Sequence, residues 1–600
     1  MAVVVLAALC SFALASSPSS HAWNSLNNSV NGRLYQTRPV EASCFSIFNG
    51  SPIATDSTAC ATVRSSYLDP YYRADSFPIY QQAQSSMCLS NPGDQCLLDN
   101  ADGSPAPLPA VNAKCSQGSI PPYYIDVRAA GDVSAAFAFA NKYDVGLSVK
   151  NSGHDYLMRN DGKGTLNLWT RNLRNMSYDA AFIPCGCTSR SYNETQAKPA
   201  ITVGGGVNFD EVYTFAHANN VTYIGGYAST VAASGGWLQA GGHSTLSPVY
   251  GLGADRVLQF KIVTPDGLLR TANECQNADL WWALRGGGGG TFGVVVESTS
   301  LVEPAMPIAV ASINIPKNAT KASQMQWLEL MVDSSIEWAT SGWGGHISQV
   351  SLVNMNPLLD LTAAEASMQN ATTLALSLGG KANVTVVPSW WEVYQGFVVP
   401  GEATTGGTAR FLNSRLTPRR MFESPAGRNS ILAYLEQILD FPAAVYVPFT
   451  TPFLWQGDPA STSVNLAWYT SLWHTAMHVD IAWNSTYDDR LSALTKLTNL
   501  TRAAEAMTGP AGGTYMNEAN PFTQNWKQDF WGTNYDRLLA IKKKYDPKGL
   551  LECWKCIGFD DEDNHDDRLI LRAAEALRTD LDQTDRESLR QQPYQPMTTG

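Results

Sequence analysis

The chain has 600 residues, with a hydrophobic fraction of 44% and a charged fraction of 16%, which describe a folded globular protein rather than a disordered one. This length exceeds what one ordinary core can hold, so we expect at least two domains. The formal net charge of -12 and the lack of a dense Lys/Arg cluster exclude a nucleic-acid partner, because binding to phosphates needs a basic surface.

The N-terminus predicts a secretory signal peptide over residues 1–15. An apolar run extends from Ala2 to Ala15 and ends in Ala13-Leu14-Ala15, a pattern of small residues that is typical of a cleavage site. A buried N-terminal helix is the alternative interpretation. The run is too short to cross a bilayer, and no later stretch of about 18 apolar residues exists, so we expect no membrane association.

Cysteines and glycosylation sequons indicate the same compartment. Residues 16–115 are rich in Ser, Pro, Asn and Cys and predict a loop-rich lead-in held by disulfides. The cysteines after the signal peptide are even in number, so we expect all of them to be oxidised: Cys44, Cys60, Cys88, Cys96, Cys115, Cys185, Cys187, Cys275, Cys553 and Cys556. N-x-S/T sequons occur at Asn27, Asn49, Asn175, Asn193, Asn220, Asn318, Asn370, Asn383, Asn484 and Asn499. We therefore expect a secreted, extracellular glycoprotein.

Regular elements begin near residue 116. Hydrophobic periodicity predicts strand, helix and strand, twice over, at 123–129, 131–144, 145–150, 201–207, 208–220 and 221–226. We place these elements in a first domain, residues 116–303. Residues 304–510 mix helices such as 323–339 with aromatic-rich runs and predict a second α+β domain. Residues 511–559 contain a helix that Pro547 stops, and the charged residues 560–600 predict a mobile acidic tail.

Glycines are concentrated in four clusters, at 204–206, 235–236, 241–242 and 286–290. Glycine allows a ligand or a second backbone to approach closely, so the clusters together indicate one extended ligand, although any single cluster fits a tight turn. A Rossmann site is excluded by order, because 286–290 follows a helix and precedes a strand. A Walker A loop is also absent.

The segment Val149-Lys150-Asn151-Ser152-Gly153-His154-Asp155 places a histidine in a tight turn after a strand. This segment resembles the flavin-attachment loop of the berberine-bridge-enzyme-like family, within the vanillyl-alcohol-oxidase class of FAD proteins. Further similar segments follow in the family's order, over roughly residues 120–300 and 513–558. They are Gly225 to Leu258, VTPDG, NADLWWALRGGGGGTFGVVV, YMNEAN and WGTNYDRLLAIKKKYDP.

The resemblance implies an α+β fold, with a PCMH-type FAD-binding domain of two subdomains and an α+β substrate domain built on an antiparallel sheet. It implies that the C-terminal segment 511–559 closes on the FAD domain, and that FAD is attached covalently through His154. The cofactor-binding residues that we expect from it are Asn151, Ser152, Gly153, His154, Asp155, Ala228, Val231, Gly235, Gly236, Gly241, Gly242, His243 and Asn517.

One position departs from the family pattern. Many members use a cysteine as a second covalent anchor to the flavin, and this position aligns with Ala228. The chain therefore resembles the singly anchored members, for which we expect a lower reduction potential and a less open cleft. Val231 aligns with the family's oxygen gatekeeper, where a small side chain is similar to that of the oxidases. Ordinary strand packing is the alternative role for Val231.

Oxidation of an alcohol needs an acid/base group. The segment Tyr515-Met516-Asn517-Glu518 resembles the family's Tyr-x-Asn segment beside the flavin, so Tyr515 and Glu518 are the candidate catalytic residues. In the substrate domain, Arg415 and His474 lie in segments that resemble family ones. Each of these residues could instead be structural.

The resemblance to fungal secreted members implies hydride transfer from a small alcohol or secondary metabolite to FAD. Molecular oxygen then accepts the electrons and gives hydrogen peroxide. A carbohydrate oxidase of the same family and a flavin-bearing binding protein with little turnover are the alternatives. Cys553 and Cys556 form a C-x-x-C pair for which structural disulfides are favoured. No metal site is expected, because His474 and His478 lack the glutamate of an HExxH motif.

Overall fold

The computed structural model describes residues 18–559, apart from residues 90, 100–103, 105, 110–112, 188–195, 402–407 and 442–443. The predicted signal peptide and the predicted acidic tail lie outside the described residues, as does the sequon at Asn193. No helix in the described part of the chain combines the length and the hydropathy needed to span a bilayer.

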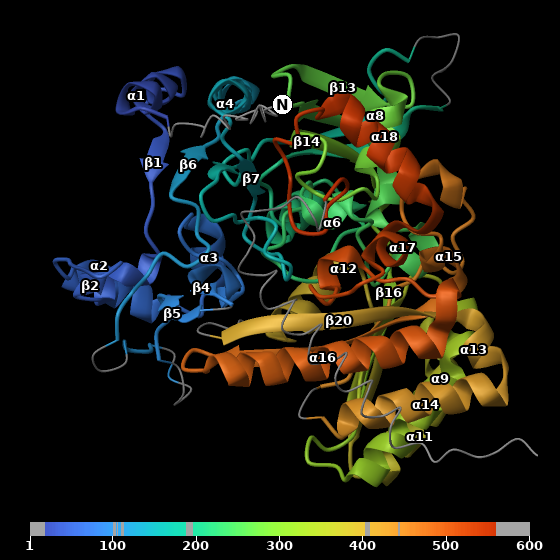
Figure 1. The fold of residues 1–600 in the computed structure, drawn as a ribbon. Coiled ribbons are helices and arrows are strands. Elements are labelled where there is room, and N and C mark those ends of the chain that lie inside the picture. Colours follow the sequence, from blue (N-terminus) through green and yellow to red (C-terminus); the bar gives the residue numbers. More distant parts are fainter. Residues whose placement is uncertain are drawn as a thin grey trace, which may run out of the picture.

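A four-stranded sheet of order β1-β6-β8-β7 opens the first half of the fold (Figure 1). β6, β8 and β7 are parallel, and β1 joins β6 in antiparallel orientation. Helix α4 connects β6 to β7, which confirms the strand, helix and strand expected over 123–150. The bounds are β1 (Leu34–Gln36), β6 (Tyr123–Asp126), α4 (Ala130–Tyr143), β7 (Leu147–Lys150) and β8 (Leu166–Trp169).

A five-stranded antiparallel sheet of order β13-β12-β14-β10-β9 follows. Helix α5 (Phe209–Ala218) packs beside it. The Asn208 N–H donates to the Glu211 side chain at 2.8 Å at its start, and Phe209, Val212, Tyr213 and Ala216 form its buried face. The remaining bounds are β9 (Met176–Phe182), β10 (Lys198–Gly204), β11 (Val221–Thr222), α6 (Gly236–Gln239), α7 (Ser247–Tyr250), β12 (Val257–Val263), β13 (Leu269–Asn273), α8 (Ala278–Leu284), β14 (Val294–Leu301) and β15 (Glu303–Pro304).

A seven-stranded antiparallel sheet of order β19-β16-β18-β17-β21-β22-β20 forms the second half. Its strands are β16 (Ile308–Asn314), β17 (Gly344–Ser348), β18 (Ser351–Asn356), β19 (Lys381–Val387), β20 (Thr408–Pro418), β21 (Tyr446–Phe449) and β22 (Ser471–Ala482). Its helices are α9 (Lys321–Ser341), α10 (Leu361–Ser367), α11 (Gln369–Ser377), α12 (Trp390–Val393), α13 (Arg419–Glu423), α14 (Pro425–Leu439), α15 (Ala467–Thr470) and α16 (Tyr487–Thr508). The fold class expected from the sequence is confirmed.

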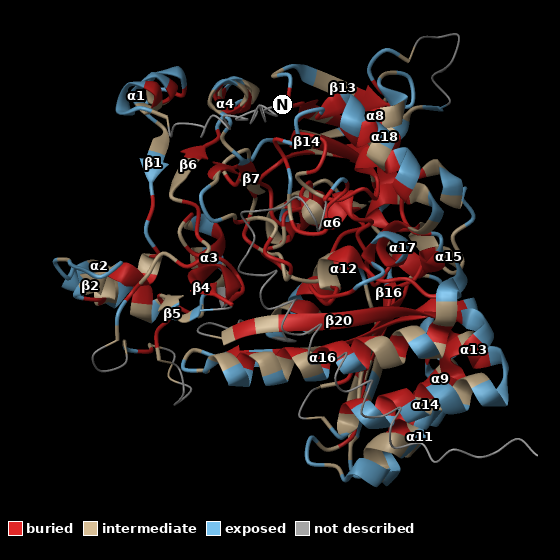
Figure 2. Cartoon of the chain, viewed as in Figure 1, coloured by how far each residue is buried: buried red, intermediate tan, exposed pale blue. Residues whose placement is uncertain are grey.

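The two faces of this sheet differ in what they contact. Helices α9, α14 and α16 cover one face, and their inward sides are buried while their outward sides are exposed (Figure 2). Phe411, Trp473 and Met477 belong to the core beneath these helices. Strand residues alternate between faces, so the neighbouring Leu412, His474 and His478 point the other way, toward the first half of the chain. The sheet thus presents polar side chains to the space between the two halves.

The C-terminal segment returns to the first half. The bounds of its helices are α17 (Trp526–Trp531) and α18 (Tyr535–Tyr545), and α18 ends two residues before Pro547, as expected. Leu147 N–H donates to the Leu550 carbonyl at 3.1 Å. Lys542 Nζ pairs with Asp546 at 2.6 Å and donates to the carbonyls of Thr291 and Leu551. These contacts join the end of the chain to β7 and to the glycine run before β14.

The lead-in contains more regular structure than its sequence predicts. Helices α1 (Ser20–Ser29), α2 (Ser57–Ser65) and α3 (Pro70–Asp75) begin at Ser19, Asp56 and Asp69, whose side chains accept hydrogen bonds from the first turn. Short hairpins complete it, with bounds β2 (Ile47–Phe48), β3 (Ser51–Pro52), β4 (Met87–Cys88) and β5 (Asn91–Gln95). The expectation of a loop-rich segment was therefore wrong in part, because caps rather than periodicity define these short helices.

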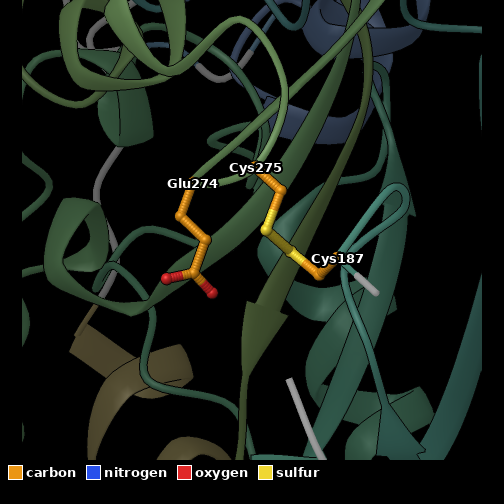
Figure 3. A group of neighbouring side chains, drawn as sticks. All are labelled: Cys187, Glu274 and Cys275. Carbon is orange, nitrogen blue, oxygen red and sulfur yellow. A yellow bond between two sulfur atoms is a disulfide. The ribbon is translucent and has the colours of Figure 1, made fainter. Parts of the chain in front are cut away.

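Four disulfides are present in the described residues: Cys44–Cys60, Cys96–Cys115, Cys187–Cys275 and Cys553–Cys556. Two of them hold the lead-in, as expected. The expectation that every cysteine is oxidised was wrong, since the disulfides of the described residues include neither Cys88, which is buried, nor Cys185, which is exposed. Glu274 lies beside the Cys187–Cys275 pair (Figure 3), but the sulfur atoms are bonded to each other, so this group offers no thiolate ligands.

Candidate active site

A cavity of about 530 Å³ contains most of the residues that the sequence singles out. Of the expected cofactor-binding and catalytic residues, those that line it are Asn151, Ser152, Gly153, His154, Asp155, Ala228, Val231, Gly236, His243, Tyr515, Asn517 and Glu518. Gly235, Gly241 and Gly242 do not line it. A Cβ on Gly242 would meet the ring of Trp237 at 2.9 Å, so this glycine allows close packing behind the cavity wall.

The wall of the cavity leaves room for an extended group at Gly236, where a Cβ would meet no atom within 4 Å. Behind it, Gly289 approaches so closely that a Cβ there would lie 2.8 Å from the Gly236 Cα. Side chains at these two positions would fill the cavity or push its wall apart. Gly236, Gly289 and Gly290 thus form a cradle of backbone that allows the close approach a dinucleotide needs, whereas the clusters 204–206 and 241–242 do not line the cavity.

The attachment loop, residues 150–155, leaves the end of β7. Lys150 is fully buried, and its Nζ donates to the carbonyls of Ser76 (3.2 Å), Phe77 (2.7 Å) and Ile79 (2.7 Å). Gly153 has a φ of +94°, and its carbonyl accepts from Gln81 N–H at 3.2 Å. The lead-in is therefore bonded directly to the loop that carries His154.

His154 projects from this loop into the cavity wall. Its Nε2 shares a hydrogen bond with Thr230 Oγ1 at 2.9 Å, and its Nδ1 has no hydrogen bond among the described residues. Burial, with a smaller effect of the Arg73 charge, lowers the pKa of His154 to about 3. The imidazole is therefore neutral at physiological pH, so one ring nitrogen keeps a lone pair that can form a bond.

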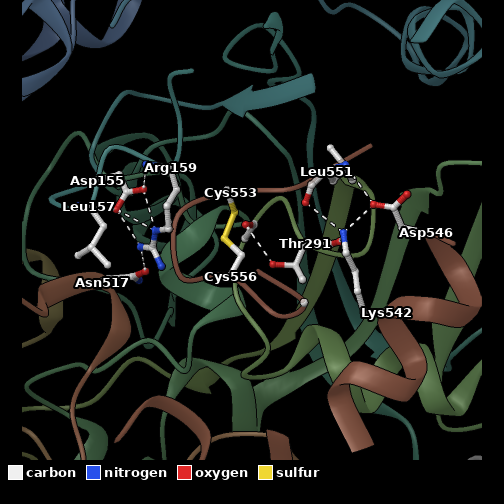
Figure 4. Close-up of a disulfide and its surroundings, with 12 residues drawn as sticks. Asp155, Leu157, Arg159, Thr291, Asn517, Lys542, Asp546, Leu551, Cys553 and Cys556 are labelled. Atoms are coloured by element: carbon white, nitrogen blue, oxygen red, sulfur yellow. Dashed lines mark hydrogen bonds and ion pairs between the residues drawn. A yellow bond between two sulfur atoms is a disulfide. The ribbon is translucent and has the colours of Figure 1, made fainter. Parts of the chain in front are cut away.

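A network of charge-assisted hydrogen bonds links the attachment loop to the C-terminal segment (Figure 4). Arg159 pairs with Asp155 at 2.8 Å and donates to the Asn517 side-chain oxygen at 2.9 Å. The Asn517 amide donates to the Gly236 carbonyl at 3.0 Å and to the Tyr515 hydroxyl at 2.7 Å. Asn517 is thereby held at the junction of three segments that border the cavity.

The two candidate acid/base residues differ in protonation. Burial and the nearby Glu518 carboxylate raise the pKa of Tyr515 well above its ordinary value, so its hydroxyl stays protonated. Burial also favours the neutral form of Glu518, but the hydrogen bond with His243 and the electrostatic interactions with the neighbouring imidazoles together outweigh burial and lower its pKa. Glu518 is therefore the candidate that can accept a proton.

Glu518 belongs to a group with His243 and His474, which we name the His–Glu cluster. Its Oε1 lies 3.3 Å from His243 Nε2, and its Oε2 lies 3.8 Å from His474 Nδ1. Burial lowers the pKa of His474 to about 4, so this imidazole is neutral. His243 also shares a hydrogen bond through Nδ1 with Thr450 Oγ1 at 3.2 Å. The cluster unites the loop after α6, strand β22 and the C-terminal segment.

Arg415 does not line the cavity. Its guanidinium is buried, forms an ion pair with Asp529 at 2.6 Å and donates to Thr508. These contacts indicate that Arg415 has a structural role. Sequence reasoning missed Gln82 of the lead-in and a group on the substrate-domain strands, Arg410, Leu412, Tyr446 and His478, all of which line the cavity. Alternation along β20 and β22 could have indicated which side chains share a face, but not what that face meets.

Comparison with known proteins agrees with this geometry. The FAD binding domain family matches residues 121–273, and the berberine and berberine-like family matches residues 514–553. An FAD-linked oxidoreductase of Aspergillus flavipes is 40% identical over 91% of this chain and 94% of the relative. A VAO-type flavoprotein oxidase of Thermothelomyces thermophilus is 30% identical, over 89% of this chain and 90% of that protein.

Solved structures show the same fold. A VAO-type flavoprotein from Myceliophthora thermophila C1 superposes with a TM-score of 0.78 at 28% identity, covering 91% of this chain and 96% of that one. A glucooligosaccharide oxidase from Acremonium strictum superposes with a TM-score of 0.59 at 20% identity over 73% of this chain and 92% of that one, a likeness of fold alone. The chain belongs to the berberine-bridge-enzyme-like family of FAD-linked oxidoreductases.

Proposed function

We propose that this protein is a secreted oxidase that holds FAD through a covalent bond to His154 and oxidises a small alcohol or secondary metabolite. The observation that carries the proposal is the position of His154. A neutral imidazole borders a glycine-walled cavity, and its Nδ1 is left open while Nε2 is bonded to Thr230. FAD, when bound, supplies the acceptor for a hydride from the substrate C–H bond.

The chain's own residues fit this cofactor. Asn151 to Asp155 and Gly236 would hold it along the cradle, and Asn517 would orient it from the C-terminal segment. A single anchor is favoured because Ala228 occupies the position aligned with the second anchor. The only cysteine among the described lining residues, Cys553, is bonded to Cys556. We propose Nδ1 of His154 as the linking atom.

We propose Glu518 as the proton acceptor. A hydroxyl that loses hydride from its carbon must also lose its proton, and an ionised carboxylate beside the cavity can take it. Hydrogen bonding to His243 orients the carboxylate and lets the proton be shared. Tyr515, being protonated, would instead donate a hydrogen bond to the substrate oxygen.

Oxygen as the final acceptor is supported by two observations. The relative at 30% identity is described as an oxidase, and Val231 presents a small side chain at the cavity. Molecular oxygen would take up two electrons and two protons and leave as hydrogen peroxide. A small residue at this position leaves room for oxygen, where a longer side chain would obstruct it.

Secretion is supported by the exposure of the glycosylation sequons. Of the nine sequon asparagines in the described residues, eight are exposed, and Asn27 is partly buried. The four disulfides also suit an oxidising compartment.

At the substrate side, Leu412 and Tyr446 line the cavity beside Arg410 and His478. This mixture fits a substrate with an apolar body and a hydroxyl group.

The deciding experiment separates attachment from turnover. Protein secreted by a fungal host is precipitated with acid, and yellow flavin should remain on the peptide that contains His154. The native holoenzyme is then mixed with a panel of alcohols and sugars, first without oxygen and then with it. We expect flavin bleaching by an alcohol, followed by recovery with one equivalent of peroxide. Release of all flavin by acid, or a reduced flavin that persists in air, would contradict the proposal.

A further inference from the structure

The His–Glu cluster is built like a metal site. Its three ligand atoms, two imidazole nitrogens and one carboxylate oxygen, all lie within 4.8 Å of one another. Two ligands at about 2.0–2.1 Å from a tetrahedral ion are separated by about 3.3 Å. His243 Nε2 and Glu518 Oε1 are 3.3 Å apart, which is long for a hydrogen bond but matches two ligands of one ion.

Unpartnered atoms in the cluster are the second observation. His474 is fully buried, and neither of its ring nitrogens has a hydrogen bond among the described residues. The same holds for Glu518 Oε2, which lies 3.8 Å from His474 Nδ1. Buried polar atoms are nearly always bonded, so lone pairs that converge without a partner indicate a missing ligand. With the single ring proton of His474 on Nε2, both His474 Nδ1 and Glu518 Oε2 are acceptors that face each other, so the missing ligand between them is a cation or a donor.

The surroundings suit a divalent cation. Glu518 contributes one negative charge, and in the described part of the chain its ion-pair partners are these two imidazoles, with no Lys or Arg among them. The other ring nitrogen of His243 is bonded to Thr450 Oγ1 at 3.2 Å, the outer contact that orients a ligating histidine. Two histidines and a glutamate with one open position form a ligand set that Zn²⁺ accepts.

From this geometry we propose that His243, His474 and Glu518 bind one Zn²⁺ ion, and that the bound ion inhibits substrate oxidation. Zinc binding does not depend on the proposed function; the inhibition of substrate oxidation rests on it. The ion bonds to the same carboxylate that accepts the substrate proton. When the ion binds Nε2 of His243, the imidazole stays neutral with its proton on Nδ1, where it donates to Thr450 Oγ1, and the ion occupies the carboxylate that would accept the substrate proton. The site thus switches between a proton acceptor when free and a blocked state when the ion is present.

The ligands come from three segments that are far apart in the sequence, at positions 243, 474 and 518. No pair among them has the short spacing that identifies metal sites in a sequence, and for that reason such a site is not expected from the sequence alone. Strand β22 places His474 behind the cavity wall, and the Tyr515–Glu518 turn brings the carboxylate to within 3.8 Å of it. The site exists only in the folded protein.

The test uses the flavin-loaded holoenzyme after treatment with a chelator and transfer to metal-free buffer. ZnCl₂ is titrated in competition with a fluorescent zinc indicator, and bound zinc is counted by elemental analysis after gel filtration. We expect one zinc per chain. His474→Ala should weaken binding by about 100-fold or more, since even contacts outside the ligand shell cost 10–100-fold. His478→Asn, which changes another cavity histidine outside the cluster, should keep the original affinity.

Inhibition is measured separately, as anaerobic flavin reduction by substrate with and without saturating zinc. Zinc should slow reduction in the unaltered protein and leave the rate of His474→Ala unchanged relative to its own zinc-free rate. Unchanged covalent flavin content shows that the variant is folded, and Glu518→Gln gives a second test of zinc binding. Zinc binding that is absent, or equal in His474→Ala, would overturn the site. Faster reduction with zinc would overturn its inhibitory role. Zinc counting needs no substrate, so failure of the proposed oxidase activity is recognised independently.

Discussion

The attachment loop and the His–Glu cluster border the same cavity but differ in how far their buried polar groups are hydrogen-bonded. In the loop, Lys150 is bonded to three carbonyls, and Asp155 is paired with Arg159. In the cluster, His474 and one oxygen of Glu518 have no hydrogen bond among the described residues, and the same is true of the neighbouring His346. Both regions are largely buried, so solvent exposure does not explain the difference.

The difference indicates two kinds of binding. A region whose polar groups are already satisfied is rigid and can hold a permanent group in one position. A region with buried unsatisfied groups gains free energy whenever a ligand supplies the missing partners, so it suits a substrate or ion that exchanges. The comparison predicts that changes in the loop affect cofactor attachment and stability, whereas changes in the cluster affect reduction by substrate.

The largest expected effect is that of His154→Ala. Without the imidazole no bond to the flavin can form, so acid precipitation should release all flavin from a protein that still binds FAD. The measurement is flavin absorbance in pellet and supernatant. The control is His478→Ala, which removes another cavity histidine and should leave the flavin in the pellet. Acid-stable flavin in His154→Ala would place the attachment elsewhere.

Glu518→Gln should affect the other region. We expect anaerobic flavin reduction to slow by about 10²–10⁴-fold, the usual contribution of a positioned base, with covalent flavin unchanged. Tyr515→Phe should have a smaller effect, because burial keeps the Tyr515 hydroxyl protonated. Stopped-flow absorbance in metal-free buffer measures both. A larger loss in Tyr515→Phe than in Glu518→Gln would reverse the assignment of the proton acceptor.

The sequence predicted the attachment loop much better than the region around the His–Glu cluster. The attachment loop and the glycine cradle are local, since a few consecutive residues determine the backbone turn that a flavin needs. The strands of the second half carry the expected antiparallel sheet, but Arg410, Tyr446 and His478 reach the cavity only through pairing between distant strands. Arg415 shows the same limit, because its buried partner Asp529 lies 114 residues away.

Lys150→Met tests whether the loop is held by satisfied contacts. The change leaves two buried carbonyls and one partly buried carbonyl without this donor, which should cost about 3 kcal/mol or more and lower the unfolding temperature by roughly 5 °C or more. A lower fraction of covalent flavin should accompany it. Lys163→Met is the matched control, since the ion pair of Lys163 with Asp94 is partly exposed and contributes little. Thermal scans and acid precipitation measure the two effects, and equal scans for both variants would argue against the role of Lys150.

The smallest expected effect is that of Val231→Leu, in the cavity wall next to Thr230, the hydrogen-bond partner of His154. Val231 lines the cavity and is partly buried, so one added carbon narrows the space beside the flavin without removing a polar contact. We expect reoxidation by oxygen to slow by roughly tenfold, equivalent to about 1.4 kcal/mol of barrier, because oxygen must reach the reduced ring through this space. Anaerobic reduction by substrate should change little, since neither Glu518 nor Tyr515 is affected. The two half-reactions are followed separately by stopped-flow absorbance. If both slow equally, Val231 shapes the substrate pocket and not the path of oxygen.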